Sequence, residues 1–229
     1  MSLASSGAVL RALLRPDLRA ARTRPLLAAG TAGLAVTAGP AVFSTHVEPA
    51  PAALLLRIAT VLGALGLAFL LDDPAARTTE VLPVTKALRK GLRMTLGLMA
   101  FGLFWGASAG LSRLGVDAGA RESFPVGALA TEGAALAALT LTLALLGLRY
   151  SASGSGSPPA ASALILLLAT ALLLPDPSTL FPAPGAANGD AATLRWGILL
   201  VLALCFSGWE LRERRTVHRG KGVRRTWRT

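Results

Sequence analysis

Runs of about twenty apolar residues alternate with short polar or basic stretches along this chain of 229 residues. A helix needs about twenty apolar residues to cross a bilayer core about 30 Å thick, so these runs are of spanning length. The pattern predicts an all-α, polytopic membrane protein with six transmembrane helices, at about residues 25–44, 52–71, 92–112, 126–148, 160–174 and 193–209. The fifth run is the shortest, so it either spans a slightly thinned bilayer or forms a re-entrant segment.

The composition of the chain is that of a membrane protein rather than of a soluble domain. Apolar residues make up 53% of it and charged residues only 15%, whereas soluble domains carry about 25% charged residues. The lone cysteine, Cys205, leaves no internal disulfide, and the two histidines, His46 and His218, lie outside the apolar runs. The sequence therefore predicts no metal site and no cofactor bound to this chain.

The positions of the basic residues predict the orientation of the spans, because Lys and Arg near span ends are retained in the cytoplasm. With both termini inside, nineteen of the 23 Lys and Arg residues fall in inside segments and Arg57 lies within a span. Only Arg113, Arg121 and Arg195 then fall outside. We expect a multi-pass protein of the plasma membrane with both termini cytoplasmic.

Both tails are basic. In residues 1–24, leucines and arginines between residues 9 and 22 take separate faces of a helix, which predicts an amphipathic helix in the cytoplasmic interface, kinked or restarted at Pro16. A simple basic anchor for the first span is the alternative. Residues 210–229 form a tail expected to lie against anionic lipid headgroups. Membrane topology explains the net charge of +11, so we predict membrane lipids and no nucleic acid as partners.

A polar stretch at residues 151–159, SASGSGSPP, separates the first four predicted spans from the last two. Segments rich in Gly and Ser behave as flexible linkers. We expect a flexible inside linker here, between a four-span and a two-span group.

Arg57 and Glu132 are the ionisable residues inside the predicted spans. Each lies five or six residues from the outer start of its span, which places both about 8 Å deep at 1.5 Å per residue. Equal depth permits an intramembrane ion pair that lines an outward substrate path or acts as a gate, because charge buried in hydrocarbon is costly and commonly functional. The alternatives are a purely structural pair, or two side chains that reach separately to the outer headgroups.

The third span carries Gly102, Gly106 and Gly110, one helical turn apart. Small residues at this spacing let a second helix approach closely in a membrane. The spacing predicts a helix contact, either within the bundle, which is the favoured alternative, or between two chains.

The longest inside connection joins the second and third spans and reads LDDPAARTTEVLPVTKALRKGLR from residue 71 to residue 93. After Pro83 the sequence predicts a short helix with Thr85 as N-cap, leucines on one face and basic residues on the other. A connection that only reverses the chain needs far fewer residues. Its length and helical pattern therefore indicate a docking element for a cytoplasmic partner.

The sequence predicts no catalytic residue. The phosphate-cradling loop GxxxxGK(S/T), the zinc motif HExxH and paired CxxC motifs are absent from it. We therefore expect that the chain is not an enzyme and hydrolyses no ATP by itself.

At the connection after the second span the chain resembles the permease subunits of type-2 ABC transporters, which include many drug, polysaccharide and bacteriocin exporters. Those subunits have six spans, an N-terminal interfacial helix, and after span two an acidic, Thr-containing segment followed by a Leu-Pro-Val/Leu-Ser/Thr element and basic residues. The corresponding residues here, with one leucine of the predicted helix, are Asp72, Asp73, Thr78, Thr79, Glu80, Leu82, Pro83, Val84, Thr85 and Leu88. The two aspartates also fit a simpler role, as caps at the end of the second span.

The resemblance implies that this loop docks on a separate cytoplasmic ATPase subunit, which binds ATP and Mg²⁺. It also implies a second permease, either another copy or a homologue, and export as the direction of transport. The alternative is a non-transporting membrane scaffold or assembly protein. A secondary carrier would have polar or interrupted spans and internal repeats, which this sequence lacks.

Overall fold

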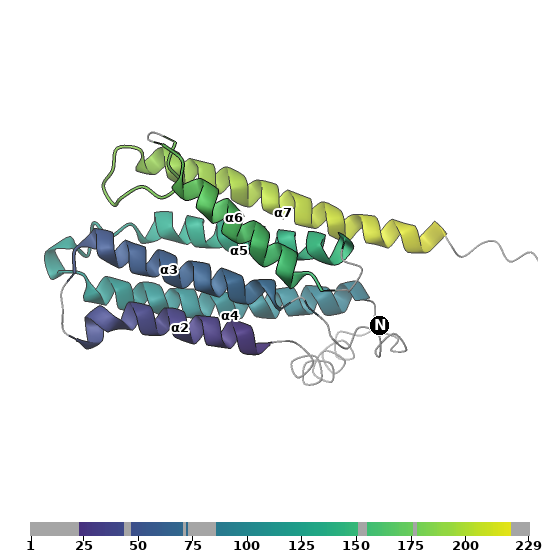
Figure 1. The fold of residues 1–229 in the computed structure, drawn as a ribbon, viewed down its shortest axis with the longest axis horizontal. Helices are drawn as coiled ribbons and strands as arrows, with labels where there is room; N and C mark the ends of the chain where they lie inside the picture. The colour runs from purple at the N-terminus through teal and green to yellow at the C-terminus, as the bar shows by residue number, and fades with distance from the viewer. Residues whose placement is uncertain are drawn as a thin grey trace, which may run out of the picture.

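Six α-helices make up the described part of the chain (Figure 1). The computed structural model describes residues 23–43, 47–70, 72, 86–150, 155–175 and 178–220, with residues 86–90 and 210–220 described by their backbone alone. The helices are α2 (Thr23–Val42), α3 (Pro49–Ala68), α4 (Lys86–Gly115), α5 (Val126–Tyr150), α6 (Ser157–Leu172) and α7 (Gly189–Gly220), with a short 3-10 helix η1 (Ala118–Ala120) after α4. The predicted all-helical fold is confirmed for this part of the chain.

Five helices, all except α6, are long and apolar enough to cross a membrane. Each of the six predicted spans overlaps one helix, and α6 contains most of the fifth. With 16 residues α6 extends about 24 Å, which is short of a bilayer core about 30 Å thick. The lengths and composition of the five long helices indicate a membrane-embedded protein.

The helices run up and down the bundle, so the chain turns at two ends (Figure 1). At one end α2, α4 and α6 begin and α3, α5 and α7 finish. We call it the basic end, because the basic sequences at the start of α4 and the end of α7 belong to it. At the opposite end residues 116–125 and 178–188 connect helices, and we call it the loop end.

Helix α3 lies at the centre of the bundle, with α2 and α4 on one side and α5 on the other (Figure 1). Half of the apolar stretch of α3 and 67% of that of α5 are buried inside the bundle, against 17% for α7 at the edge. Beyond α5 lie α6 and α7, and α4 makes few contacts with α5. Helices α3 and α5 are therefore each covered by outer helices, α3 by α2 and α4, and α5 by α6 and α7, whereas α7 leaves most of its apolar face uncovered.

Glycines bring α2 and α3 together. A Cβ on Gly33 would lie 3.1 Å from the Cβ of Ala59, and one on Gly66 would lie 2.9 Å from the Cα of Leu26. Contacts this short mean that larger side chains do not fit without moving a helix, as expected where membrane helices pack through small residues. The glycines that pack α2 against α3 are thus not the ones that the sequence pattern singled out.

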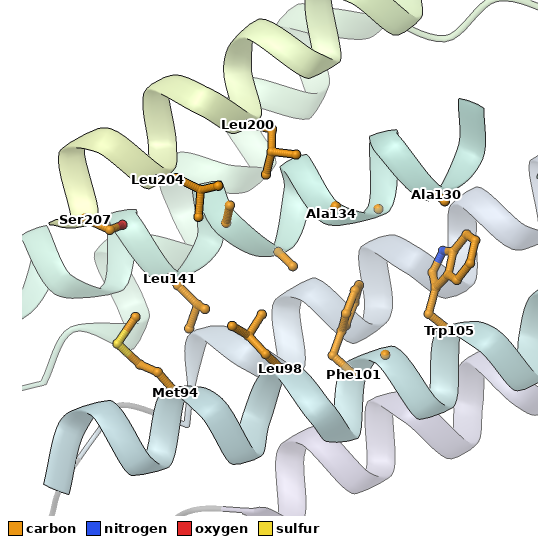
Figure 2. A pocket seen from close by; sticks show the side chains of 14 residues that line it. Met94, Leu98, Phe101, Trp105, Ala130, Ala134, Leu141, Leu200, Leu204 and Ser207 are labelled. Carbon is orange, nitrogen blue, oxygen red and sulfur yellow. The ribbon is translucent and has the colours of Figure 1, made fainter. Parts of the chain in front are cut away.

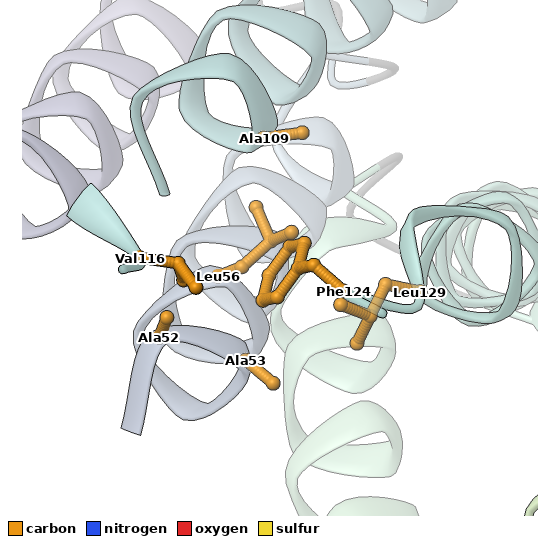
Figure 3. Close-up of a cluster of buried hydrophobic side chains, with 7 residues drawn as sticks. All are labelled: Ala52, Ala53, Leu56, Ala109, Val116, Phe124 and Leu129. Carbon is orange, nitrogen blue, oxygen red and sulfur yellow. The ribbon is translucent and has the colours of Figure 1, made fainter. Parts of the chain in front are cut away.

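A core of buried side chains closes the loop end around Leu56, Val116 and Phe124 (Figure 3). The backbone N–H of Val47 donates to the carbonyl of Gly115 at 3.0 Å, which joins the segments after α2 and α4. Arg121 donates through Nε to the carbonyl of Val116, also at 3.0 Å. Backbone groups outside the helices are therefore hydrogen bonded here, as a membrane-embedded chain requires.

Helix α4 is described from Lys86 onward, and Thr85, which the sequence predicts as the N-cap, lies outside the described residues. The predicted short helix after Pro83 is therefore helical in the part described, but it is not separate from the third span. The two form one helix of 30 residues, about 45 Å long at 1.5 Å per residue. Helix α7, with 32 residues, extends in the same way beyond the predicted span end at Trp209.

Candidate functional site

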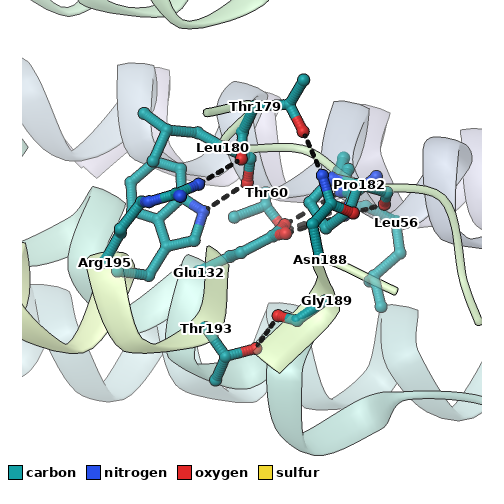
Figure 4. A network of polar contacts seen from close by, with 12 residues as sticks. Leu56, Thr60, Glu132, Thr179, Leu180, Pro182, Asn188, Gly189, Thr193 and Arg195 are labelled. Atoms are coloured by element: carbon teal, nitrogen blue, oxygen red, sulfur yellow. Dashed lines mark hydrogen bonds and ion pairs between the residues drawn. The ribbon is translucent and has the colours of Figure 1, made fainter. Parts of the chain in front are cut away.

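Arg57 of α3 and Glu132 of α5 face each other at the loop end and form a two-pronged ion pair (Figure 4). Nε of Arg57 donates to Oε2 of Glu132 at 2.9 Å, and Nη2 donates to Oε1 at 2.7 Å. The side chains are 18% and 6% exposed, respectively. The structure thus brings together the two residues placed at equal depth by the sequence, and they do not reach separately to the bilayer surface.

The loop between α6 and α7 is held on this pair through its backbone carbonyls. Nη2 of Arg57 also donates to the carbonyl of Pro182 at 3.0 Å. Trp196 donates from its indole N–H to the carbonyl of Leu180 at 2.8 Å, and Arg195 donates to that of Thr179 at 3.2 Å. Three of four consecutive carbonyls are therefore bound by side chains of α3 and α7.

Aromatic rings complete this arrangement. The guanidinium of Arg57 lies 5.5 Å from the ring centre of Phe181, within the range of a cation–π contact. Phe181 in turn lies 5.4 Å from the ring of Trp196, which is fully buried. We call the side chains of Arg57, Glu132, Phe181, Arg195 and Trp196, with the carbonyls of residues 179, 180 and 182, the loop-end cluster.

The local sequence explains why the loop folds back on the bundle. Pro182 and Pro184 have no backbone N–H, so this stretch cannot satisfy its carbonyls by forming a helix. Gly185 has φ of 79°, a conformation that favours glycine and turns the chain toward α7. Sequence analysis did not identify Trp196, although a Trp in an apolar run signals a need for a hydrogen-bond acceptor.

A second polar site lies at the basic end, where Asp72 follows α3 and meets the start of α6. The carboxylate is 3% exposed and accepts hydrogen bonds from the backbone N–H groups of Gly156 at 2.8 Å and Ser157 at 3.1 Å. The hydroxyl of Ser155 donates to it at 3.0 Å, and the hydroxyl of Ser157 donates as well. We call Asp72 with residues 155–157 the Asp72 latch.

The Asp72 latch revises two expectations. Asp72 does not cap the end of the second span; it caps the first turn of α6, and its burial removes it from any exposed docking surface. The prediction of a flexible linker at residues 151–159 is wrong for its second half. Residues 155 and 156 are hydrogen bonded to Asp72, and residues 157–159 form the start of α6. A Gly-Ser-Pro-Pro sequence also suits a helix start, since proline is favoured in the first turn.

Close backbone contact supports the latch. A Cβ on Gly147 of α5 would lie 2.6 Å from the carbonyl oxygen of Gly156, and a Cβ on Gly156 would lie 2.5 Å from that of Ala144. Both positions therefore require glycine for the start of α6 to reach the end of α5. The latch thus sits at the meeting point of α3, α5 and α6.

Most of the expected docking residues lie outside the described residues: Asp73, Thr78, Thr79, Glu80, Leu82, Pro83, Val84 and Thr85. Leu88 falls in the first turns of α4, where only the backbone is described. The N-terminal amphipathic helix predicted within residues 9–22 and the last nine residues of the tail also lie outside the described part. The docking element therefore stays a prediction. The described residues that flank it in the sequence are Asp72 and the start of α4.

The glycine stripe of α4 faces outward. A Cβ on Gly102, Gly106 or Gly110 would meet no atom within 4 Å, and all three residues are exposed. The favoured expectation of an internal helix contact is therefore wrong, because α2 and α3 pack on the opposite face of α4. A contact between two chains, the other alternative, stays a prediction.

An apolar groove of about 390 Å³ runs along α5 between α4 and α7 (Figure 2). Small residues such as Ala134 of α5 form its floor, and Leu98 of α4 and Leu204 of α7 form its walls. Ser207 lies toward the basic end of the groove, where its hydroxyl is 2.8 Å from that of Thr142. The groove exists because α4 and α5 barely touch.

Residues 106–110 read GASAG and match the pattern GxSxG of a nucleophile elbow. That motif requires a sharp turn between a strand and a helix, which exposes the serine. Here Ser108 is buried within α4, an uninterrupted helix, about two turns before its end. The match therefore indicates no esterase chemistry.

The described residues contain no group of three or more His, Cys, Asp or Glu side chains that could hold a metal ion. No protein-family model, curated protein or solved structure matches this chain. The length of α4 and the contacts of the loop-end cluster and of the Asp72 latch are thus the basis for inferring a function.

Proposed function

We propose that this chain is the membrane-spanning permease subunit of an ATP-driven ABC transporter, with six spans, both termini cytoplasmic and its ATPase on a separate subunit. The observation that carries the proposal is the long α4, which is described from Lys86 onward, directly after the Leu-Pro-Val-Thr element in the sequence. Its 30 residues exceed the roughly twenty that a bilayer requires, so its first turns extend toward the docking element. Movement of a docked partner would act directly on a spanning helix.

Two features of the bundle fit a transport cycle. The loop-end cluster holds its loop through hydrogen bonds and one ion pair, which break and reform without covalent chemistry. Alternating access requires an element with two arrangements, and we propose that this loop is that element. The apolar groove and the few polar side chains in the spans favour an amphipathic or lipid-like substrate, and the family resemblance favours export.

A scaffold or assembly role is the second candidate, and a specific observation favours it. Arg57 directs its Nε and Nη2 groups at Glu132 and at the Pro182 carbonyl, so most of the polar capacity of the pair is used within the chain rather than on a substrate. A scaffold needs only such a structural pair and an exposed surface for partners. The two functions differ in whether an ATPase subunit is bound in a fixed ratio.

Gentle solubilisation of native membranes with a tagged chain, followed by identification of co-purifying proteins, tests the proposal. We expect one soluble ATPase with a Walker-type nucleotide site per chain, lost on triple alanine substitution of Leu82, Pro83 and Val84. A matched control is triple alanine substitution of Leu172, Leu173 and Pro175, which are exposed near the loop end. Absence of an ATPase under conditions that preserve a known ABC complex favours the scaffold.

A further inference from the structure

Helix α6 is tied to other parts of the bundle beyond both of its ends. Its first turn is bound by Asp72, which lies 84 residues before Gly156 in the chain. The loop that follows its last turn is bound by Arg57, Arg195 and Trp196. A short helix held in this way connects the basic end with the loop end.

The tie at the basic end is strong for a single side chain. The first N–H groups of a helix have no partner within it, and their dipoles favour a negative charge. A buried carboxylate that accepts several such bonds is held more firmly than a neutral acceptor. Because Asp72 follows α3 directly and binds the first turn of α6, displacement of this residue acts on the start of α6.

The tie at the loop end continues through the body of α6. Leu164, in the middle of α6, is fully buried in one cluster with Trp196. The same Trp196 donates to the carbonyl of Leu180 and touches Phe181, which lies against Arg57. Displacement of α6 along its axis therefore disturbs the packing that holds the loop on the Arg57–Glu132 pair.

We propose that Asp72 is a positioning residue that couples the end of α3 to the loop-end cluster through α6. A pull on Asp72 moves α6, and α6 releases or closes the loop at residues 178–188. Coupling between the two ends is a property of the chain alone. Only the identity of the driver, an ATPase bound to the connection between α3 and α4, rests on the proposed function.

Accessibility of a cysteine in the loop measures this coupling. Replacing Cys205 by Ser removes the native thiol, and Ser178→Cys then places a half-buried thiol at the start of the loop. Ala183→Cys, at an exposed position, serves as the reference for reagent reactivity. Arg57→Lys, which weakens the two-pronged pair directly, shows that the Ser178→Cys reporter responds to opening.

In the purified chain without nucleotide, Asp72→Asn is expected to raise the labelling rate at Ser178→Cys by about fivefold or more, the lower range of typical coupling between sites. The rate at Ala183→Cys should not change. The control Glu122→Gln removes an exposed carboxylate of the loop end and should leave both rates unchanged. Ser157→Ala removes one hydroxyl from the latch and should give a smaller increase in the same direction.

A rate at Ser178→Cys within twofold of the parent in folded Asp72→Asn, with a clear response to Arg57→Lys, overturns the inference. Asp72→Asn is judged to have failed to fold if it elutes as an aggregate. In that case the labelling rate at Ser178→Cys in Ser157→Ala, compared with the parent, decides the question in its place. The proposed function fails separately, when no ATPase co-purifies with the parent chain. With the ATPase present, ATP should alter labelling in the parent but not in Asp72→Asn.

Discussion

The two ends of the bundle bury charge in opposite ways. At the loop end, Arg57 and Glu132 neutralise each other, and Nη2 of the guanidinium also binds a loop carbonyl. At the basic end, the described partners of Asp72 are two backbone N–H groups and two serine hydroxyls, without a positively charged side chain. One site relies on a matched ion pair, the other on the dipoles of a helix start.

This difference determines what each site tolerates. An ion pair in an apolar environment needs both partners, because either charge alone is left without compensation. A carboxylate at a helix start is stabilised by several bonds of moderate strength, so loss of one donor is tolerated. Loss of one charged partner at the loop end should therefore lower the free energy of unfolding sharply. Loss of one hydrogen-bond donor at the basic end should lower it only slightly.

Removing one member of the ion pair has the largest expected effect. Glu132→Ala leaves Arg57 buried without a counter-charge and should lower the free energy of unfolding by about 3–5 kcal/mol. Thermal unfolding in detergent measures the change. The paired test is Arg57→Glu, which should impair folding and function, followed by Glu132→Arg in the same chain, which should restore them. No recovery in the double variant contradicts a pairing role.

Overpacking the contact between α5 and the Asp72 latch should have the next largest effect. Gly147→Ala places a Cβ within 2.6 Å of the Gly156 carbonyl and should cost up to about 3 kcal/mol, because backbone has to move. The control is Gly106→Ala, where the new Cβ meets nothing within 4 Å and helix propensity improves by about 1 kcal/mol. Equal unfolding temperatures for the two variants would show that α5 and α6 do not meet as described.

Removing the carboxylate of the latch should have an intermediate effect. Asp72→Ala leaves two helix N–H groups without their acceptor and should cost about 2 kcal/mol. Glu122→Ala, at an exposed acidic residue, is the control and should stay within about 0.5 kcal/mol of the parent. Chemical unfolding in mixed micelles gives both values. A larger loss of unfolding free energy for Asp72→Ala than for Glu132→Ala would contradict the prediction that the loop end is the more sensitive of the two ends.

The smallest expected effect concerns one hydrogen bond of the loop-end cluster. Trp196→Phe removes the N–H that binds the Leu180 carbonyl and keeps a ring beside Phe181, so the loss should be about 1 kcal/mol. Trp209→Phe, at a residue that is 63% exposed, is the matched control. Unfolding temperatures that agree between the two variants would mean that the indole N–H contributes nothing to holding the loop.

Features set by local sequence could be predicted, and features set by distant partners could not. Apolar run length predicts the helices, because bilayer thickness and helix rise fix the number of residues required. Equal depth in two spans placed Arg57 beside Glu132 as one of several alternatives. Neither inference needed knowledge of how the helices pack.

The partner of Asp72 was missed because nothing in the local sequence points to a helix that starts 84 residues later. The glycine stripe of α4 was assigned to the wrong contact for a related reason. Gly102 and Gly106 have the spacing of an interface, but helix spacing alone does not say which face a neighbour covers. The glycines that do pack, such as Gly33 and Gly66, look no different in the sequence.

The long chain separation between Asp72 and α6 sets an order of events during biosynthesis. A ribosome adds about 5–20 residues per second, so Gly156 emerges about 4 to 17 s after the aspartate that binds it. During that interval α4 and α5 are synthesised, and the donors of residues 155–157 that bind the carboxylate do not yet exist. The latch therefore closes only after these helices are made, and its closure marks the arrival of α6 in a bundle that is already largely assembled.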